Sequence, residues 1–317
     1  MLSTVLCPID FSPLTESALA WTQRMASQLK LPVRLVHVVP PAPVFAADPE
    51  VAVALAPIPL PSEAQREACA ADMLKPLAET LLASGLEVRT ELLHGDPERV
   101  LGELLAQEPT VLTVMGTHGY GAIPRFLLGS VTVEVLRRAA GPVLAVRASQ
   151  PPERVERIGV AVDFSAACEP AIALGAALAR ICDAELHLIH VGLIMEMLGT
   201  AEAELPTYLA RIDAATRQAA HQELAEIAGR LQGVRVQTRV RMGSTPYREL
   251  VVDAQEQALQ MLVMGTHGRT GLQRLFLGSV TERTLQVAAC PVLAVKLPAD
   301  VPAQLSWRDV ADDLQGS

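Results

Sequence analysis

Short runs rich in Val, Leu and Ile alternate along the chain with longer stretches in which apolar residues recur at helical spacing. Nearly continuous apolar strands that alternate with helices are typical of a parallel sheet covered by helices on both faces. The pattern predicts five strands in each half of the chain. They lie at 4–9, 33–39, 88–93, 111–115 and 143–146, and again at 158–162, 186–191, 234–240, 261–264 and 292–295.

The two halves carry the same short blocks in the same order. VMGTHG, LGSVT and PVLAV each recur 149 residues later, and the DFS that begins at Asp10 recurs at Asp163. A repeat of this length indicates a duplicated domain and not a solenoid unit. The charged, proline-containing stretch SQPPERVER separates the copies. We therefore expect domains at 1–148 and 156–297, followed by a tail at 298–317.

A glycine motif of spacing G-x2-G-x9-G-S follows the fourth strand of each half. The motif consists of Gly116, Gly119, Gly129 and Ser130 in the first half and of Gly265, Gly268, Gly278 and Ser279 in the second. Glycines let backbone approach a phosphate and take positive φ, and a helix N-terminus supplies N–H donors. Turn glycines with a capping serine are the alternative interpretation. Two complete copies favour phosphate binding.

Asp10 and Asp163 directly follow the first strand of their halves. In parallel α/β sheets, ligands bind beyond the carboxyl ends of the strands, near the point where the strand order reverses. A carboxylate there can hold a Mg²⁺ ion that bridges to a nucleotide, bond a ribose hydroxyl, or cap the next helix. The pattern leaves these roles open.

Positive charge is scarce around the glycine motifs. The lysines are Lys30, Lys75 and Lys296, and none lies in a motif, which excludes a P-loop of the GxxxxGK[ST] type. Backbone N–H groups, hydroxyls, magnesium and arginine would have to meet phosphate charge. Arg125 and Arg274 hold matched positions between the second and third glycines and are candidates, with solvated surface charge as the alternative.

Histidines also repeat between the halves. His118 and His267 lie between the first two glycines, where they are candidate ligand contacts, and His37 and His190 end the second strands. No serine or cysteine nucleophile with a partner acid is visible at a recognisable spacing, so we expect packing against backbone and no catalytic role.

Composition narrows the possible partners. The net charge of −9 and the 3% aromatic content argue against binding nucleic acid. The N-terminus lacks the basic region of a signal peptide, and the apolar stretch at 40–61 contains seven prolines, which would break a membrane helix. The five cysteines show no metal-ligand spacing. We expect a cytoplasmic protein with reduced thiols and no membrane span.

Taken together, these motifs resemble the ATP-binding branch of the universal stress protein family, over nearly the whole chain. The resemblance implies two tandem, doubly wound, five-stranded parallel sheets of the Rossmann-like, adenine nucleotide alpha hydrolase-like class. It places adenine near the first and second strands and the phosphates on the glycine loop. The residues carried over are Pro8, Ile9, Asp10, Val38, Met115, Gly116, Gly119, Gly129, Ser130 and Val131 in the first half. Their counterparts are Ala161, Val162, Asp163, Val191, Met264, Gly265, Gly268, Gly278, Ser279 and Val280.

The resemblance also implies assembly. Family domains pair edge to edge through their last strands, which here would join 143–146 to 292–295, and two chains would form a homodimer. The first glycine loop has Tyr120 and Pro124 where the second has Arg269 and Gln273. We therefore expect tighter nucleotide binding in the second half.

The expected function is a stress-response regulator that binds ATP and Mg²⁺ in one or both halves and acts on a protein partner that the sequence does not identify. No base to activate water is evident, so at most slow hydrolysis or self-phosphorylation is expected. One alternative is an interaction module with vestigial sites, which would use the 40–61 loop or the tail. Another is a nucleotidyl transferase or ligase, but the HxGH or SGGxDS signature is replaced by PIDFS and AVDFS.

Overall fold

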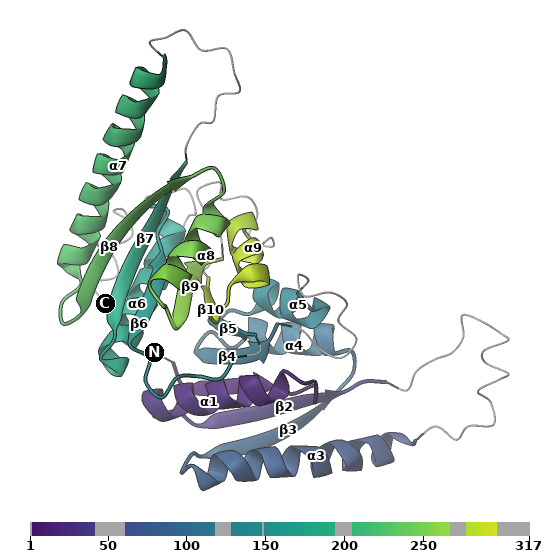
Figure 1. Cartoon of the computed structure of the whole chain (residues 1–317). Coiled ribbons are helices and arrows are strands. Elements are labelled where there is room, and N and C mark those ends of the chain that lie inside the picture. The colour runs from purple at the N-terminus through teal and green to yellow at the C-terminus, as the bar shows by residue number, and fades with distance from the viewer. Residues whose placement is uncertain are drawn as a thin grey trace, which may run out of the picture.

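The computed structural model describes residues 2–41, 61–117, 128–147, 149–193, 205–266 and 277–296. They form one ten-stranded sheet in the order β3-β2-β1-β4-β5-β10-β9-β6-β7-β8 (Figure 1). The strands are β1 (Thr4–Pro8), β2 (Val33–Val39), β3 (Val88–His94), β4 (Val111–Gly116), β5 (Val143–Val146), β6 (Arg157–Ala161), β7 (Glu185–Leu193), β8 (Arg235–Gly243), β9 (Met261–Gly265) and β10 (Val292–Val295). We call the part up to Arg147 the first lobe and the part from Ser149 onward the second lobe.

Each lobe contributes five parallel strands, and every apolar run predicted from the sequence coincides with a strand to within a few residues at its ends. In the first lobe β1 pairs with β2 on one side and with β4 on the other, and in the second lobe β6 pairs likewise with β7 and β9. The strand order therefore reverses between β1 and β4 and between β6 and β9. The α/β class and the parallel sheet are confirmed.

The two lobes meet through their last strands. Strand β5 pairs antiparallel with β10, whereas the other strand pairs of the sheet, as far as the structure describes it, are parallel. This is the edge-to-edge pairing that the resemblance implied. The pairing covers two short apolar edges that would otherwise stay open to other chains.

Helices cover both faces of the sheet and extend the core across the joint. They are α1 (Thr15–Leu29), α3 (Glu63–Ala83), α4 (Pro97–Ala106), α5 (Ser130–Arg138), the 3₁₀ turn η1 (Ala166–Cys168), α6 (Glu169–Cys182), α7 (Leu205–Arg230), α8 (Pro246–Glu256) and α9 (Ser279–Val287). Residues of α1, α3, α6 and α7 pack on one face, and those of α4, α5, α8 and α9 pack on the other. Successive residues of a strand project to opposite faces of the sheet, so Val5 packs in the core on one face and Leu6 in the core on the other.

Local signals explain where several helices begin. Ser62 and Gln65 form a reciprocal capping box at the start of α3. Asp96 accepts a hydrogen bond from the Arg99 amide at 3.0 Å, and Pro97 occupies the first turn of α4. None of the helices in the described ranges is both long and apolar enough to cross a bilayer.

Candidate functional site

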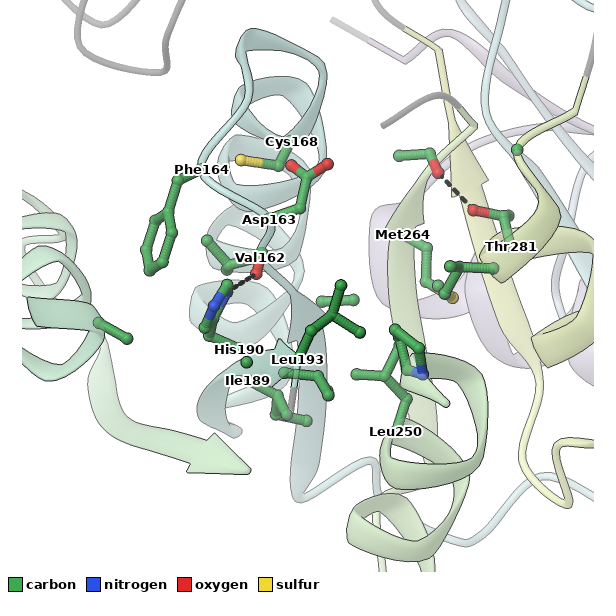
Figure 2. A pocket seen from close by; sticks show the side chains of 18 of the residues that line it. Val162, Asp163, Phe164, Cys168, Ile189, His190, Leu193, Leu250, Met264 and Thr281 are labelled. Atoms are coloured by element: carbon green, nitrogen blue, oxygen red, sulfur yellow. Dashed lines mark hydrogen bonds between the residues drawn. The ribbon is translucent and has the colours of Figure 1, made fainter. Parts of the chain in front are cut away.

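A recess opens in each lobe beyond the carboxyl ends of the strands, at the point where the strand order reverses. The recess of the second lobe has a volume of about 760 Å³, and the one of the first lobe about 480 Å³. Figure 2 shows the second recess, with Asp163 and Phe164 on one side and Met264 and Thr281 on the other. Ligands of doubly wound folds bind at this position.

The structure brings the sequence-predicted residues together at these recesses. The first is lined by Pro8, Ile9, Asp10, Val38, Met115, Gly116, Gly129, Ser130 and Val131. The second is lined by Ala161, Val162, Asp163, Val191, Met264, Gly265, Gly278, Ser279 and Val280. The remaining candidates, His118, Gly119, Arg125, His267, Gly268 and Arg274, lie outside the described residues, as do most of the 40–61 loop and the C-terminal tail.

The third glycine of each motif begins a helix at the recess. Gly129 is the N-cap of α5 and Gly278 is the N-cap of α9. A glycine has no side chain that could accept hydrogen bonds from the first-turn N–H groups, so these donors are left for a ligand. The following residues, Ser130 and Ser279, line the recesses. Each recess thus has a helix N-terminus suited to an anion.

The glycines are not required here by their backbone angle. The φ values of −63° at Gly129 and −60° at Gly278 are open to any residue, so our expectation of positive φ is wrong at these two positions. The serine-cap alternative is wrong too, because the glycine and not the serine is the N-cap. What glycine provides is space beside the N–H donors.

Hydrogen bonds hold the glycine in nearly the same frame in both lobes. In the first lobe the Gly129 amide donates to the Thr117 carbonyl at 2.8 Å, and the Thr117 amide donates to the Val146 carbonyl at 3.0 Å. The hydroxyl of Thr132 donates to the Gly116 carbonyl at 3.0 Å.

The second lobe repeats these bonds. Gly278 donates to Thr266 at 2.7 Å and Thr266 to Val295 at 2.9 Å. Thr281 donates to Gly265 at 2.8 Å (Figure 2). The ends of the fourth and fifth strands of each lobe therefore position the first turn of α5 and of α9. We call these two helices, which begin at the recesses, the site helices.

A carboxylate lies on the opposite side of each recess. Asp10 Oδ1 accepts from the Ser12 amide at 3.0 Å and from the Thr15 hydroxyl at 3.3 Å. Asp163 Oδ1 accepts from the amide and the hydroxyl of Ser165, at 3.0 and 2.6 Å. Neither aspartate is the N-cap of the next α-helix, although each orders the turn that leads into it.

A histidine and a phenylalanine pack beside each aspartate. His37 Nδ1 donates to the Ile9 carbonyl at 2.7 Å, and His190 Nδ1 donates to the Val162 carbonyl at 2.8 Å. Because a carbonyl only accepts, Nδ1 carries the proton. These histidines therefore contact backbone, as expected, and also line the recesses.

The rings of Phe11 and Phe164 lie 4.7 and 4.4 Å from these imidazoles, centroid to centroid. Both phenylalanines have left-handed backbone, with φ of 58° and 61°. Left-handed backbone is unusual for a bulky residue and tends to occur at functional sites. Phe164 lines the second recess, whereas Phe11 lines the separate hollow beside α3. Sequence reasoning missed both, although the repeated DFS was the signal.

Sequence reasoning also missed the helical walls of the recesses. Leu101 of α4 and Leu250 of α8 line matching positions. The second recess extends further, onto Thr216, Ala219 and Glu223 of α7. In the first lobe the corresponding helix, α3, instead lines a separate hollow of about 640 Å³. The described lining of the second recess contains no arginine or lysine.

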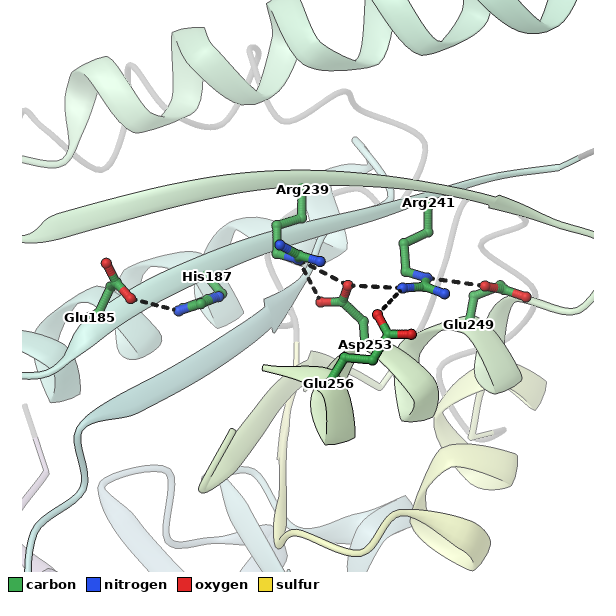
Figure 3. A network of polar contacts seen from close by, with 7 residues as sticks. All are labelled: Glu185, His187, Arg239, Arg241, Glu249, Asp253 and Glu256. Atoms are coloured by element: carbon green, nitrogen blue, oxygen red, sulfur yellow. Dashed lines mark hydrogen bonds and ion pairs between the residues drawn. The ribbon is translucent and has the colours of Figure 1, made fainter. Parts of the chain in front are cut away.

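An ion network holds the α8 wall of the second lobe against the edge strand β8 (Figure 3). Arg239 Nε donates to both carboxylate oxygens of Asp253, at 2.9 and 3.0 Å. Arg241 contacts Glu249 at 3.1 Å, Glu256 at 2.7 Å and Asp253 at 3.4 Å. Asp253 has an exposed fraction of 0%, so it is a fully buried carboxylate that needs both arginines.

Comparison with known proteins identifies the relatives of the chain. The model of the universal stress protein family matches twice, at residues 1–147 and 154–296. A universal stress protein of Mycolicibacterium smegmatis is 32% identical over 303 residues, which cover 92% of this chain and 96% of that protein. One from Mycobacterium tuberculosis is 31% identical over 306 residues, with the same coverage.

A solved structure shares the fold across both lobes. The crystal structure of a universal stress protein from Archaeoglobus fulgidus aligns with a TM-score of 0.65 at 20% identity, covering 94% of this chain and 97% of that one. The double family match and the mycobacterial relatives agree with the duplicated lobes seen in the structure. The chain therefore belongs to the universal stress protein family, with two tandem copies of the family domain.

Proposed function

We propose that each lobe binds an adenine nucleotide, ATP with Mg²⁺, and that occupancy regulates the protein in a stress response. One observation carries the proposal: at the strand-order reversal of both lobes, a glycine-capped helix N-terminus and an aspartate lie on either side of a recess with apolar walls. Membership of the universal stress protein family supports the stress-response role.

The residues present fit a bound nucleotide. Its phosphates would lie on the first-turn N–H groups of α5 or α9, which favour anions. Its base would lie against apolar side chains such as Val38 and Met115, or Val191 and Met264. No cluster of three metal-binding side chains occurs among the described residues. Mg²⁺ fits such a site, because it commonly uses one carboxylate together with phosphate oxygens and water.

The same residues do not favour fast hydrolysis. The described carboxylates and imidazoles that line the recesses are Asp10 and His37 in the first lobe, and Asp163, His190 and Glu223 of the α7 wall in the second. Each aspartate already accepts hydrogen bonds from its own turn. Each histidine donates through Nδ1 to a backbone carbonyl, and not to a carboxylate that would stabilise its protonated form when Nε2 accepts a proton. We infer a binding and regulatory role in which turnover is slow or absent.

Location and assembly complete the proposal. A cytoplasmic protein that forms a homodimer and engages a protein partner would follow the family resemblance. Light scattering at micromolar concentration, with and without ATP, tests the dimer, and a monomer mass in both conditions would contradict it.

Calorimetry on protein freed of ligand tests nucleotide binding. ATP with Mg²⁺ should bind at two sites per chain in the parent protein, at one site in Gly129→Val or Gly278→Val, and at none in the double variant. The valine side chain would occupy the space beside the N–H donors. Gly229→Val is the matched control, because a Cβ there meets nothing within 4 Å. Two sites retained in Gly278→Val would overturn the phosphate assignment.

A further inference from the structure

Two cations at matched positions reach across the joint between the lobes. Arg147 follows β5 in the first lobe, and Lys296 follows β10 in the second. The Arg147 guanidinium donates to the Gln286 carbonyl of α9, and the Lys296 ammonium donates to the Arg137 carbonyl of α5. Each lobe therefore supplies a cation to the site helix of the other lobe.

Both carbonyls lie in the last turn of their helices. Helix α5 ends at Arg138 and α9 ends at Val287. Last-turn carbonyls have no partner within the helix and carry the negative end of its dipole, so a cation stabilises them. Partial burial lowers the pKa of both Arg147 and Lys296. Both charged groups are thus partly removed from solvent where they contact the opposite lobe.

The other ends of the same two helices are the glycine sites. Helix α5 runs from Gly129, at the first recess, to the carbonyl that Lys296 contacts. Lys296 directly follows Val295, whose carbonyl accepts from Thr266, and Thr266 in turn accepts from Gly278 at the second recess.

The equivalent residues of the other lobe connect Gly278 back to Gly129. Helix α9 runs from Gly278 to the carbonyl that Arg147 contacts. Arg147 directly follows Val146, which accepts from Thr117, and Thr117 accepts from Gly129. The two helices, the two strand ends and these hydrogen bonds form a closed ring through both recesses.

We propose that Arg147 and Lys296 couple the two glycine sites, so that a nucleotide bound in one lobe raises the affinity of the other. The nucleotide part of this inference rests on the function proposed above. An anion on the first turn of α5 orders that helix and, through Lys296, the strand end that holds Gly278. The second ligand then binds a frame that is already ordered, which is a source of positive coupling.

The nucleotide arm compares affinities with and without the other site. ATP should bind the second site of the parent protein about fivefold more tightly than the same lobe binds it in a single-site variant, Gly129→Val or Gly278→Val. Lys296→Met and Arg147→Met should remove this difference while both lobes still bind. Lys296→Arg and Arg147→Lys, which exchange the residues used by the two lobes, should retain it.

The ligand-free arm measures hydrogen exchange. Lys296→Met should speed exchange of the Gly129 amide in the other lobe, and Arg147→Met that of Gly278, each by roughly the same fivefold factor. A purely local contact would leave these distant amides unchanged. Lys75→Met, at an exposed lysine of α3, is the control and should change neither amide.

The two arms separate the failure of this inference from that of the proposed function. Independent sites in the parent protein, with affinities equal to those of the single-site variants, would overturn the coupling while nucleotide binding stands. Coupling that persists in both methionine variants would overturn the role of Arg147 and Lys296. If no nucleotide binds, the proposed function fails and the coupling of nucleotide affinities fails with it. The hydrogen-exchange rates of the Gly129 and Gly278 amides then still decide whether the ring of contacts connects the two lobes.

Discussion

Leu144 of β5 lies directly opposite Leu293 of β10, at the centre of the antiparallel pair that joins the lobes. Both side chains are fully buried and belong to the same core cluster. Directly opposite residues on neighbouring strands project to the same face, so this pair belongs to both lobes at once.

Leu144→Ala and Leu293→Ala should each lower the free energy of unfolding by about 2–5 kcal/mol, because each leaves a cavity in a close-packed joint. The double variant should be non-additive by about 0.5–3 kcal/mol in a denaturant titration. Leu82→Ala, at an exposed leucine of α3, is the control. Additive effects of Leu144 and Leu293 would show that the lobes are stabilised independently.

Asp253→Ala should destabilise the second lobe by about 3 kcal/mol, because it leaves Arg239 and Arg241 without their buried carboxylate. We expect the lower end of the usual range, since the two arginine side chains are 31% and 23% exposed. The second site should also lose ATP affinity, because α8 carries Leu250. Glu87→Ala, which removes an exposed ion pair with Arg89, should cost about 0–1 kcal/mol. Unchanged thermal unfolding of Asp253→Ala would contradict the role of the network.

The second lobe should bind ATP more tightly than the first, by about fivefold, or about 1 kcal/mol. Its recess is larger, about 760 Å³ against 480 Å³, and extends onto α7. Titration of Gly129→Val against Gly278→Val compares the lobes one at a time. Arg269→Tyr, which introduces the residue found at Tyr120, should remove the salt-dependent part of the difference. A tighter first lobe would contradict this order.

Asp10→Asn and Asp163→Asn should each weaken Mg-ATP binding in their lobe by about tenfold, or about 1.4 kcal/mol. Asparagine keeps an acceptor for the Ser12 or Ser165 amide but removes the charge that a Mg²⁺ ion needs. Calorimetry in the presence of a chelator is the control, because the variants and the parent should then agree. A loss that is independent of Mg²⁺ would favour a bond to the ribose or a purely local role in the turn.

Cysteine alkylation should separate exposed from buried thiols. Burial raises the pKa of Cys7 to about 12, burial also raises the pKa of Cys168, and Cys69 is exposed. At pH 8 iodoacetamide should modify Cys69 first and Cys7 roughly a thousandfold more slowly, because the thiolate is the nucleophile. Peptide mass spectrometry follows the rates, with urea-unfolded protein as the control. Equal rates at Cys7 and Cys69 in native protein would contradict the buried position of β1.

The sequence by itself determined the strands, the duplicated lobes and most of the candidate site. Apolar runs and the repeated glycine blocks are local signals, and the carboxyl ends of parallel strands necessarily meet at one edge of the sheet. Residues as distant as Asp10 and Gly129 could therefore be assigned to one recess before their contacts were known.

Only the tertiary structure decided how the lobes act on each other and what lines the rest of each recess. The contacts of Arg147 with Gln286 and of Lys296 with Arg137 join residues 139 and 159 positions apart, and no local pattern specifies them. The wall that α7 adds to the second recess, which α3 does not repeat in the first, depends on how each helix packs on its sheet. Packing of this kind depends on how well surfaces that are distant in the sequence fit together. Hydrophobic periodicity along the chain predicts the elements but not this fit.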